Sequence, residues 1–240
     1  MLHVDGDAAG AQARLLEARA TFLECGDVWH LAQIAIDLGM IALGAGVVDA
    51  ARTWFEEALE EAHRLKDRAL EALARNNLGE VARLRGDDAA AMAHYDASLQ
   101  LYREMGAHSE IPRLIHNLGY LALHAEDATR ARARFVESLT LFRAIGLERG
   151  VAEALAGLAA VAAHAGTPVA AVQAARLWAV ADALHIVRGG PRWPTDQAEH
   201  ARYEAIARRC AGVDLFESTY AASRVLTLED VLPEAQTVAT

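Results

Sequence analysis

Two groups of polar side chains in this sequence could bind a ligand, and they lie 40 residues apart. Each group contains at least one asparagine amide and an arginine guanidinium, and Asn77 is matched by Asn117. Amide and guanidinium groups make directional hydrogen bonds, which suit a peptide backbone, a carboxylate or a sugar-like ligand. The residues predicted to bind are Asn76, Asn77, Glu80, Arg83, Arg113, His116, Asn117 and Tyr120.

Four further residues belong to the same predicted surface, namely Gln33 and Met40 before these groups and His124 and His164 after them. The alternative is a solvated helix face, on which Asn77 and Asn117 bond only to neighbouring helices. Both interpretations stay open at the level of the sequence.

The sequence shows no pattern of a catalytic or metal centre. The patterns H-E-x-x-H, G-x-S-x-G and G-x-x-x-x-G-K-S/T are absent, and Glu60 with His63 lacks the second pair that a di-iron bundle needs. Cys25 and Cys210 have no C-x-x-C partner, so we predict two small buried hydrophobic side chains instead of a disulfide or zinc site. We therefore expect no enzyme activity, no cofactor and no metal.

The elements that position these residues repeat every 40 residues. Leu38-Gly39, Leu78-Gly79 and Leu118-Gly119 share one register, and Gly157-Leu158 follows where a fourth copy is due. The same period relates Ala11, Ala51, Ala91, Ala131 and Ala171, and likewise Leu15, Phe55, Tyr95, Phe135 and Ala175. A fixed period of small and aromatic residues predicts an all-α helical-hairpin solenoid.

Turn residues divide the solenoid into a half repeat, four helix pairs and a cap. Glycine ends helices and aspartate begins them in the turns, and Thr227 is a candidate cap of the last helix. The solenoid is predicted over residues 1–187, with the half repeat at 6–26, repeats at 28–66, 68–106, 108–146 and 149–187, and a C-terminal helical cap at 188–240.

Composition narrows the classes of function. The chain is 53% hydrophobic but only 6% aromatic, which suits close packing of helices through small side chains. A net charge of −10 opposes direct contact with nucleic acid. The apolar run at 154–163 is about half the length of a membrane span, and the start resembles no signal peptide. We expect a cytoplasmic protein that binds neither nucleic acid nor membrane.

The repeat pattern resembles the tetratricopeptide repeat (TPR). The residues that carry the resemblance are Leu78, Gly79, Ala82, Gly86, Asp87, Ala91, Tyr95, Ser98 and Leu99, and Leu118, Gly119, Ala122, Asp127, Ala131, Phe135, Ser138 and Leu139. The usual repeat has about 34 residues, so the 40-residue period departs from it. The resemblance implies that first helices line a concave groove, which would place the eight predicted residues there.

Longer repeats of this kind resemble the C-terminal sensor region of MalT/LuxR-type signal-transduction ATPase regulators, as do segments 174–184, 201–204 and 228–231. That resemblance implies a protein- or ligand-binding sensor or scaffold region of a larger ATP-dependent transcriptional regulator. The alternative is a free-standing TPR adaptor that mediates protein–protein interaction. The expected partner is a protein or peptide, or a small-molecule effector in the groove. A homodimer through the exposed N-terminal half repeat is also predicted.

Overall fold

The computed structural model describes residues 8–188 and 192–238, and all regular secondary structure in these ranges is α-helix. The described ranges form twelve helices, which gather into two compact units that divide after Gly106. The all-α prediction is confirmed. The predicted division at 187/188 follows from sequence pattern alone and stays a prediction.

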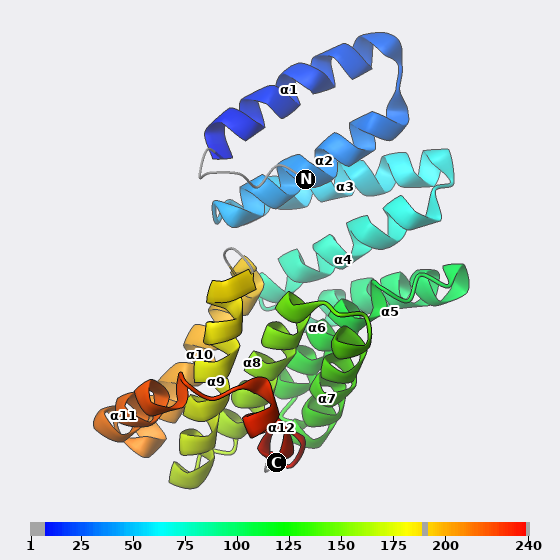
Figure 1. The fold of residues 1–240 in the computed structure, drawn as a ribbon. Coiled ribbons are helices and arrows are strands. Elements are labelled where there is room, and N and C mark those ends of the chain that lie inside the picture. The colour runs from blue at the N-terminus through cyan, green and yellow to red at the C-terminus, as the bar shows by residue number, and fades with distance from the viewer. Residues whose placement is uncertain (1–7, 189–191, 239–240) are drawn as a thin grey trace. The chain divides into compact units, whose positions relative to one another are not determined.

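The first unit consists of five helices in which each helix packs against the next (Figure 1). They are α1 (Ala8–Cys25), α2 (Val28–Gly44), α3 (Val48–Leu65), α4 (Arg68–Leu84) and α5 (Asp88–Met105). The predicted half repeat 6–26 contains α1, and the two following predicted repeats each contain one helix pair. Short turns join the helices, so neighbours run antiparallel.

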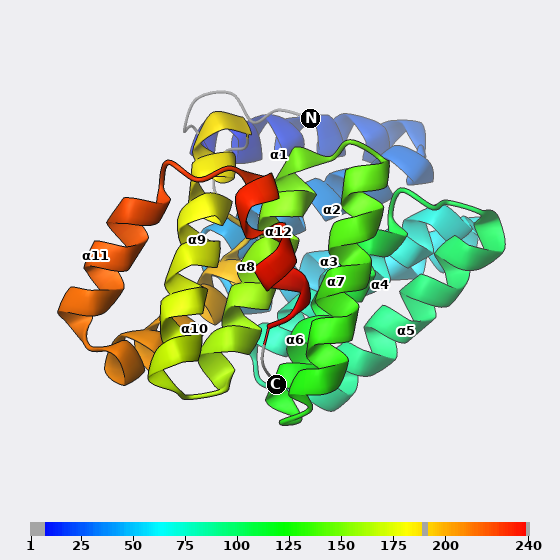
Figure 2. The same ribbon diagram turned by 60° about the horizontal axis from the view of Figure 1, so that its bottom comes forward.

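The second unit holds two helix pairs and three C-terminal helices. Its helices are α6 (Ile111–His124), α7 (Ala128–Ala144), α8 (Glu148–His164), α9 (Pro168–Arg188), α10 (Pro194–Ala211), α11 (Val213–Ser223) and α12 (Leu228–Gln236). Both α10 and α11 pack against α9, and α10 also packs against α8, while α12 lies against α8 and α9 (Figure 2). Thr227 forms a capping box with Asp230 at the start of α12, as predicted.

The turns repeat every 20 residues, twice as often as the core pattern. A residue with left-handed φ occurs at Gly26, Gly46, Lys66, Gly86, Gly106, Glu126, Gly146 and Gly166. Glycine adopts this conformation without the steric penalty that Lys66 and Glu126 bear. After four of these turns an aspartate side chain accepts hydrogen bonds from the first backbone N–H groups of the next helix, at Asp27, Asp67, Asp87 and Asp127. Each such cap contributes about 1 kcal/mol.

The 40-residue period arises from close contact between a helical glycine and an aromatic ring. A Cβ atom added to Gly79 would lie 2.5 Å from Tyr95, and one on Gly39 would lie 2.4 Å from Phe55. Gly119 stands in the same relation to Phe135. All three rings are fully buried, so the glycine lets the two helices of each pair approach closely.

One expectation from the sequence needs correction. Cys25 is exposed, so its prediction as a buried hydrophobic side chain is wrong, whereas Cys210 is partly buried against the core. His63 Nε2 lies 3.2 Å from a carboxylate oxygen of Glu71 on α4. By length and composition alone, Pro168–Ile186 in α9 could cross a membrane, but more than half of it is buried in the fold.

Candidate binding face of the second unit

The eight residues predicted to bind a ligand fall into two sets of four, one in each unit. Asn76, Asn77, Glu80 and Arg83 lie on α4, and Arg113, His116, Asn117 and Tyr120 lie on α6. All except Arg113 are buried, which contradicts the alternative of a solvated helix face. Their role in ligand binding stays a prediction.

In the first unit, the amide of Asn76 donates to the side-chain oxygen of Asn77 over 3.3 Å. A cavity of about 150 Å³ lies elsewhere in this unit, between α3, α4 and α5. Arg52, Arg85 and His94 contribute to its walls, and none of the predicted residues does. Burial lowers the pKa of His94, and the neighbouring Arg75 guanidinium acts in the same direction.

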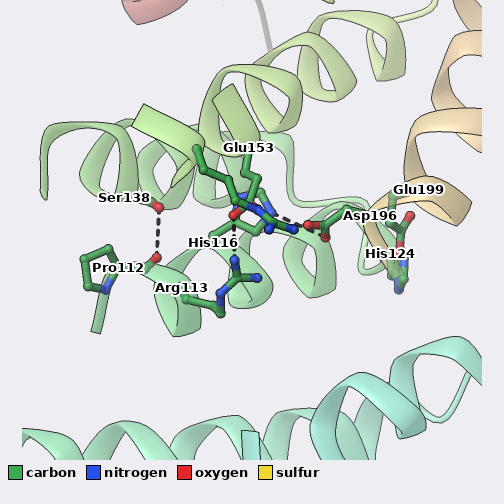
Figure 3. Close-up of polar contacts among 9 residues, drawn as sticks. Pro112, Arg113, His116, His124, Ser138, Glu153, Asp196 and Glu199 are labelled. Carbon is green, nitrogen blue, oxygen red and sulfur yellow. Dashed lines mark hydrogen bonds and ion pairs between the residues drawn. The ribbon is translucent and has the colours of Figure 1, made fainter. Parts of the chain in front are cut away.

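In the second unit, a buried carboxylate joins the first helices of two successive repeats. Glu153 on α8 has a side chain that is only 2% exposed. It accepts a hydrogen bond from Arg113 on α6 over 2.8 Å (Figure 3). It accepts another from Arg149 on α8 over 3.1 Å. A buried carboxylate needs such partners, because the loss of hydration is otherwise uncompensated.

Trp193, just before α10, provides a ring for both arginines. The guanidinium carbons of Arg113 and Arg149 lie 5.0 and 4.9 Å from the centre of the indole ring. These distances are within the range of cation–π attraction, in which Trp is the strongest aromatic partner. The two positive charges therefore contact a carboxylate from α8 and an aromatic ring from the C-terminal segment.

Two histidines of α6 face two carboxylates of α10 (Figure 3). His124 Nε2 lies 2.9 Å from Glu199 Oε1, which is hydrogen-bond distance. His116 Nε2 lies 3.6 Å from Asp196 Oδ1, too far for a hydrogen bond. The His116 ring is completely buried and makes edge contacts with Tyr120 and Phe135 at 5.1 and 5.3 Å.

The residues of α10 that make these contacts share one side of the helix. Trp193, Asp196 and Glu199 follow at intervals of three residues, and Tyr203 comes four residues later. Side chains at such intervals lie above one another on a helix surface. We call the opposing surface the α6–α8 face and define it by Arg113, His116 and His124 of α6 and by Arg149 and Glu153 of α8.

Two more histidines, buried His185 and partly buried His200, lie near this surface. Burial lowers the pKa of His185 on α9, although the Glu153 carboxylate acts in the opposite direction. Burial, together with the Arg192 guanidinium, lowers the pKa of His200 on α10 to about 4. Both imidazoles are therefore neutral at pH 7. In the described residues no three His, Cys, Asp or Glu side chains converge as metal ligands.

Sequence reasoning found Arg113, His116 and His124 of this surface but missed Arg149, Glu153, Trp193, Asp196 and Glu199. Glu153 lies 40 residues after Arg113, so the repeat register itself was a signal. The spacing of Trp193, Asp196 and Glu199 was another signal, because it places one aromatic and two acidic side chains along one helix side.

The comparisons agree with the fold. Residues 30–104 match the profile of the tetratricopeptide repeat family. The crystal structure of BtubC (BKLC) from P. vanneervenii is similar, with a TM-score of 0.60 and 16% sequence identity over 98% of this chain and 91% of that chain. At this identity the likeness shows the fold alone. No curated protein matches the chain. The repeat match and the helical fold agree with the TPR-like helical solenoid that the sequence predicted.

Proposed function

We propose that this chain is a protein-binding scaffold or sensor whose second unit binds its partner on the α6–α8 face. TPR repeats act in protein–protein interaction and scaffolding, and stacked helical repeats present extended binding surfaces. The observation that carries the proposal is the contact between α6 and α10. On this surface, two carboxylates and an aromatic ring from a distant segment meet histidine and arginine side chains.

The chemistry of the face favours a protein or peptide partner. Arginine and histidine recognise carboxylates and aromatic rings, which both occur on protein surfaces. A small-molecule effector with a carboxylate is the narrower form of the same proposal. The net charge of −10 gives no support to nucleic acid as the partner, and no catalytic role is proposed.

A comparison of partner capture by three forms of the chain tests this proposal. Arg113→Gln with His124→Gln removes two polar contacts of the face while keeping side chains that can donate hydrogen bonds. Arg134→Gln changes a partly exposed arginine on α7, outside the α6–α8 face, and is the matched control. We expect cross-linked partners to be captured by the wild type and the control but lost from the double variant. Equal capture by all three, with unchanged circular dichroism, would place binding elsewhere.

The wider context is a separate part of the proposal. The 40-residue repeat and the tail segments resemble the sensor region of ATP-dependent transcriptional regulators, in which a bound ligand would shift packing between repeats and bias an attached module. The alternative is a free-standing adaptor. An immunoblot of source cells distinguishes the two: a band far above 25.8 kDa supports the regulator, and a band at that mass supports the adaptor.

A homodimer through α1 is a further proposal about partners. Leu16 is 43% exposed and Leu23 is 52% exposed, and their seven-residue spacing places them on one side of α1. Light scattering after size exclusion tests it. A dimer that Leu16→Glu with Leu23→Glu converts to a monomer supports the proposal, and a monomeric wild type refutes it.

A further inference from the structure

We propose that the first half of α10 is a removable occupant of the α6–α8 face, and that the partner which displaces it is an acidic helix with an aromatic residue. This inference rests on the proposed function, because it names the class of partner for the same face. The observed contacts define the partner: an aromatic ring, then carboxylates three and six residues further along one helix.

The two halves of α10 are held by different forces. Its second half is anchored in the hydrophobic core of the second unit by Tyr203 and Ala207, which are fully buried. Its first half and Trp193, which directly precedes it, contact the α6–α8 face. Trp193 makes cation–π contacts with two arginines, and Asp196 and Glu199 lie against two histidines. The second half can therefore remain docked while the first half leaves.

The contacts of the first half suit an exchangeable ligand better than a permanent core. Asp196 and Glu199 are buried carboxylates, and burying a charge requires a desolvation penalty that apolar residues avoid. Ionic contacts add specificity for a sequence pattern without adding much stability. A helix that served only to cover the repeats would be expected to present apolar side chains to α6 and α8.

The occupant also leaves hydrogen bonds of the face unmade. Neither ring nitrogen of His116 has a hydrogen-bond partner among the described residues. The His116 imidazole is fully buried, and an unsatisfied buried polar group is costly. A partner that brings a carboxylate closer to His116 than the 3.6 Å of Asp196 would complete this contact, and so compete with α10.

The direct test uses α10 as its own probe. A fluorescently labelled peptide of residues 192–206 is titrated into the wild-type chain and into a variant with Trp193→Ala, Asp196→Asn and Glu199→Gln. The variant weakens the built-in occupant and leaves the α6–α8 face intact. We expect the peptide to bind the variant at least about tenfold more tightly than the wild type. A peptide with the same three substitutions is expected to lose this binding.

Equal binding of the peptide to both chains, or no binding to a folded variant, would overturn the inference. Circular dichroism establishes that the variant is folded. If the triple variant does not fold, Glu199→Gln alone provides a near-isosteric change, with the same direction of effect expected. Adding Arg113→Gln and His124→Gln to the receptor is expected to abolish peptide binding.

The outcomes separate this inference from the proposed function. The peptide could bind the triple variant more tightly than the wild type while the Arg113→Gln, His124→Gln variant still captures cellular partners. That result would support α10 as a removable occupant and reject the proposed function of the face. If the double variant lost partner capture but the peptide bound the triple variant and the wild type equally, the proposed function would stand and the removable occupant would be rejected.

Discussion

Replacing Gly79 by alanine is expected to destabilise the first unit, although alanine is the better helix former. The added Cβ atom would lie 2.5 Å from Tyr95 Cε1 and 2.6 Å from Cδ1, well inside ordinary contact of about 3.4–4 Å. The Tyr95 ring is fully buried and cannot turn into solvent. Overpacking a core costs about 1–3 kcal/mol, whereas glycine to alanine in a helix gains about 1 kcal/mol. We expect a net loss of up to about 2 kcal/mol.

Gly44→Ala is the matched control in the same unit. Gly44 is the last residue of α2, and no atom lies within 4 Å of the position that its Cβ would take. This substitution is expected to leave stability unchanged or to raise it by up to about 1 kcal/mol. The two variants should therefore shift the unfolding transition in opposite directions.

Urea unfolding followed by far-ultraviolet circular dichroism measures the difference. A lower midpoint with an unchanged slope for Gly79→Ala, beside an equal or higher midpoint for Gly44→Ala, is the expected result. Truncating the ring with Tyr95→Leu should make Gly79→Ala less costly in the double variant, because the two sites are coupled. If Gly79→Ala were as stable as Gly44→Ala, close contact between glycine and ring would not explain the 40-residue period.

Three further predictions concern charge and backbone conformation. Glu153→Gln is expected to lower the free energy of unfolding by about 2–3 kcal/mol, because Arg113 and Arg149 then share no carboxylate; thermal and urea unfolding measure this. Lys66→Gly is expected to raise stability by up to about 1 kcal/mol, because Lys66 has φ of 56°, and urea midpoints measure the gain. The pH dependence of stability is expected to contain a contribution from His200. Its pKa is about 4 in the folded chain against an ordinary 6.5, so the unfolded chain binds the proton first as the pH falls. Stability is therefore lost from pH 6.5 downwards, by about 2 kcal/mol at pH 5, and His200→Gln should remove that loss.

Each of these predictions has a control and a contradicting outcome. Glu137→Gln, at a solvent-accessible ion pair on α7, should change the free energy of unfolding little. If Glu153→Gln changed it equally little, burial of the Glu153 carboxylate would be shown to be unimportant. An unchanged or lower midpoint for Lys66→Gly would contradict the backbone argument. For His200, a variant with the same loss between pH 7 and pH 5 as the wild type would assign that loss to other groups, such as His185 and His94, whose pKa values burial also lowers.

The fold was predictable because its determinants are local and repeated. Glycine at the turns, aspartate at the caps and the pairing of Gly79 with Tyr95 are all visible within one repeat of the sequence. Ser98 and Ser138 show the same regularity, since each donates to a carbonyl 26 residues earlier, at Ala72 and Pro112. A repeated local signal fixes helices and their pairing without any long-range information.

The candidate binding face was only partly predictable, for a physical reason. His124 and Glu199 are 75 residues apart, and no spacing rule relates a repeat helix to a C-terminal helix. The sequence showed polar residues on α6 but not that α10 covers them, so the surface was expected to be open. Burial of a charged residue depends on what packs against it, and that information lies in the tertiary structure.

Hydrogen exchange along α10 tests the central claim most directly. If the first half of α10 is a removable occupant, amides of residues 197–202 should exchange by local opening, at least about tenfold faster than amides of α8 and of the second half of α10. Weakening the contacts with Glu199→Gln should increase that difference. Protection of residues 197–202 equal to that of α8, released only when the whole unit unfolds, would show that α10 is a permanent part of the core and would contradict the account.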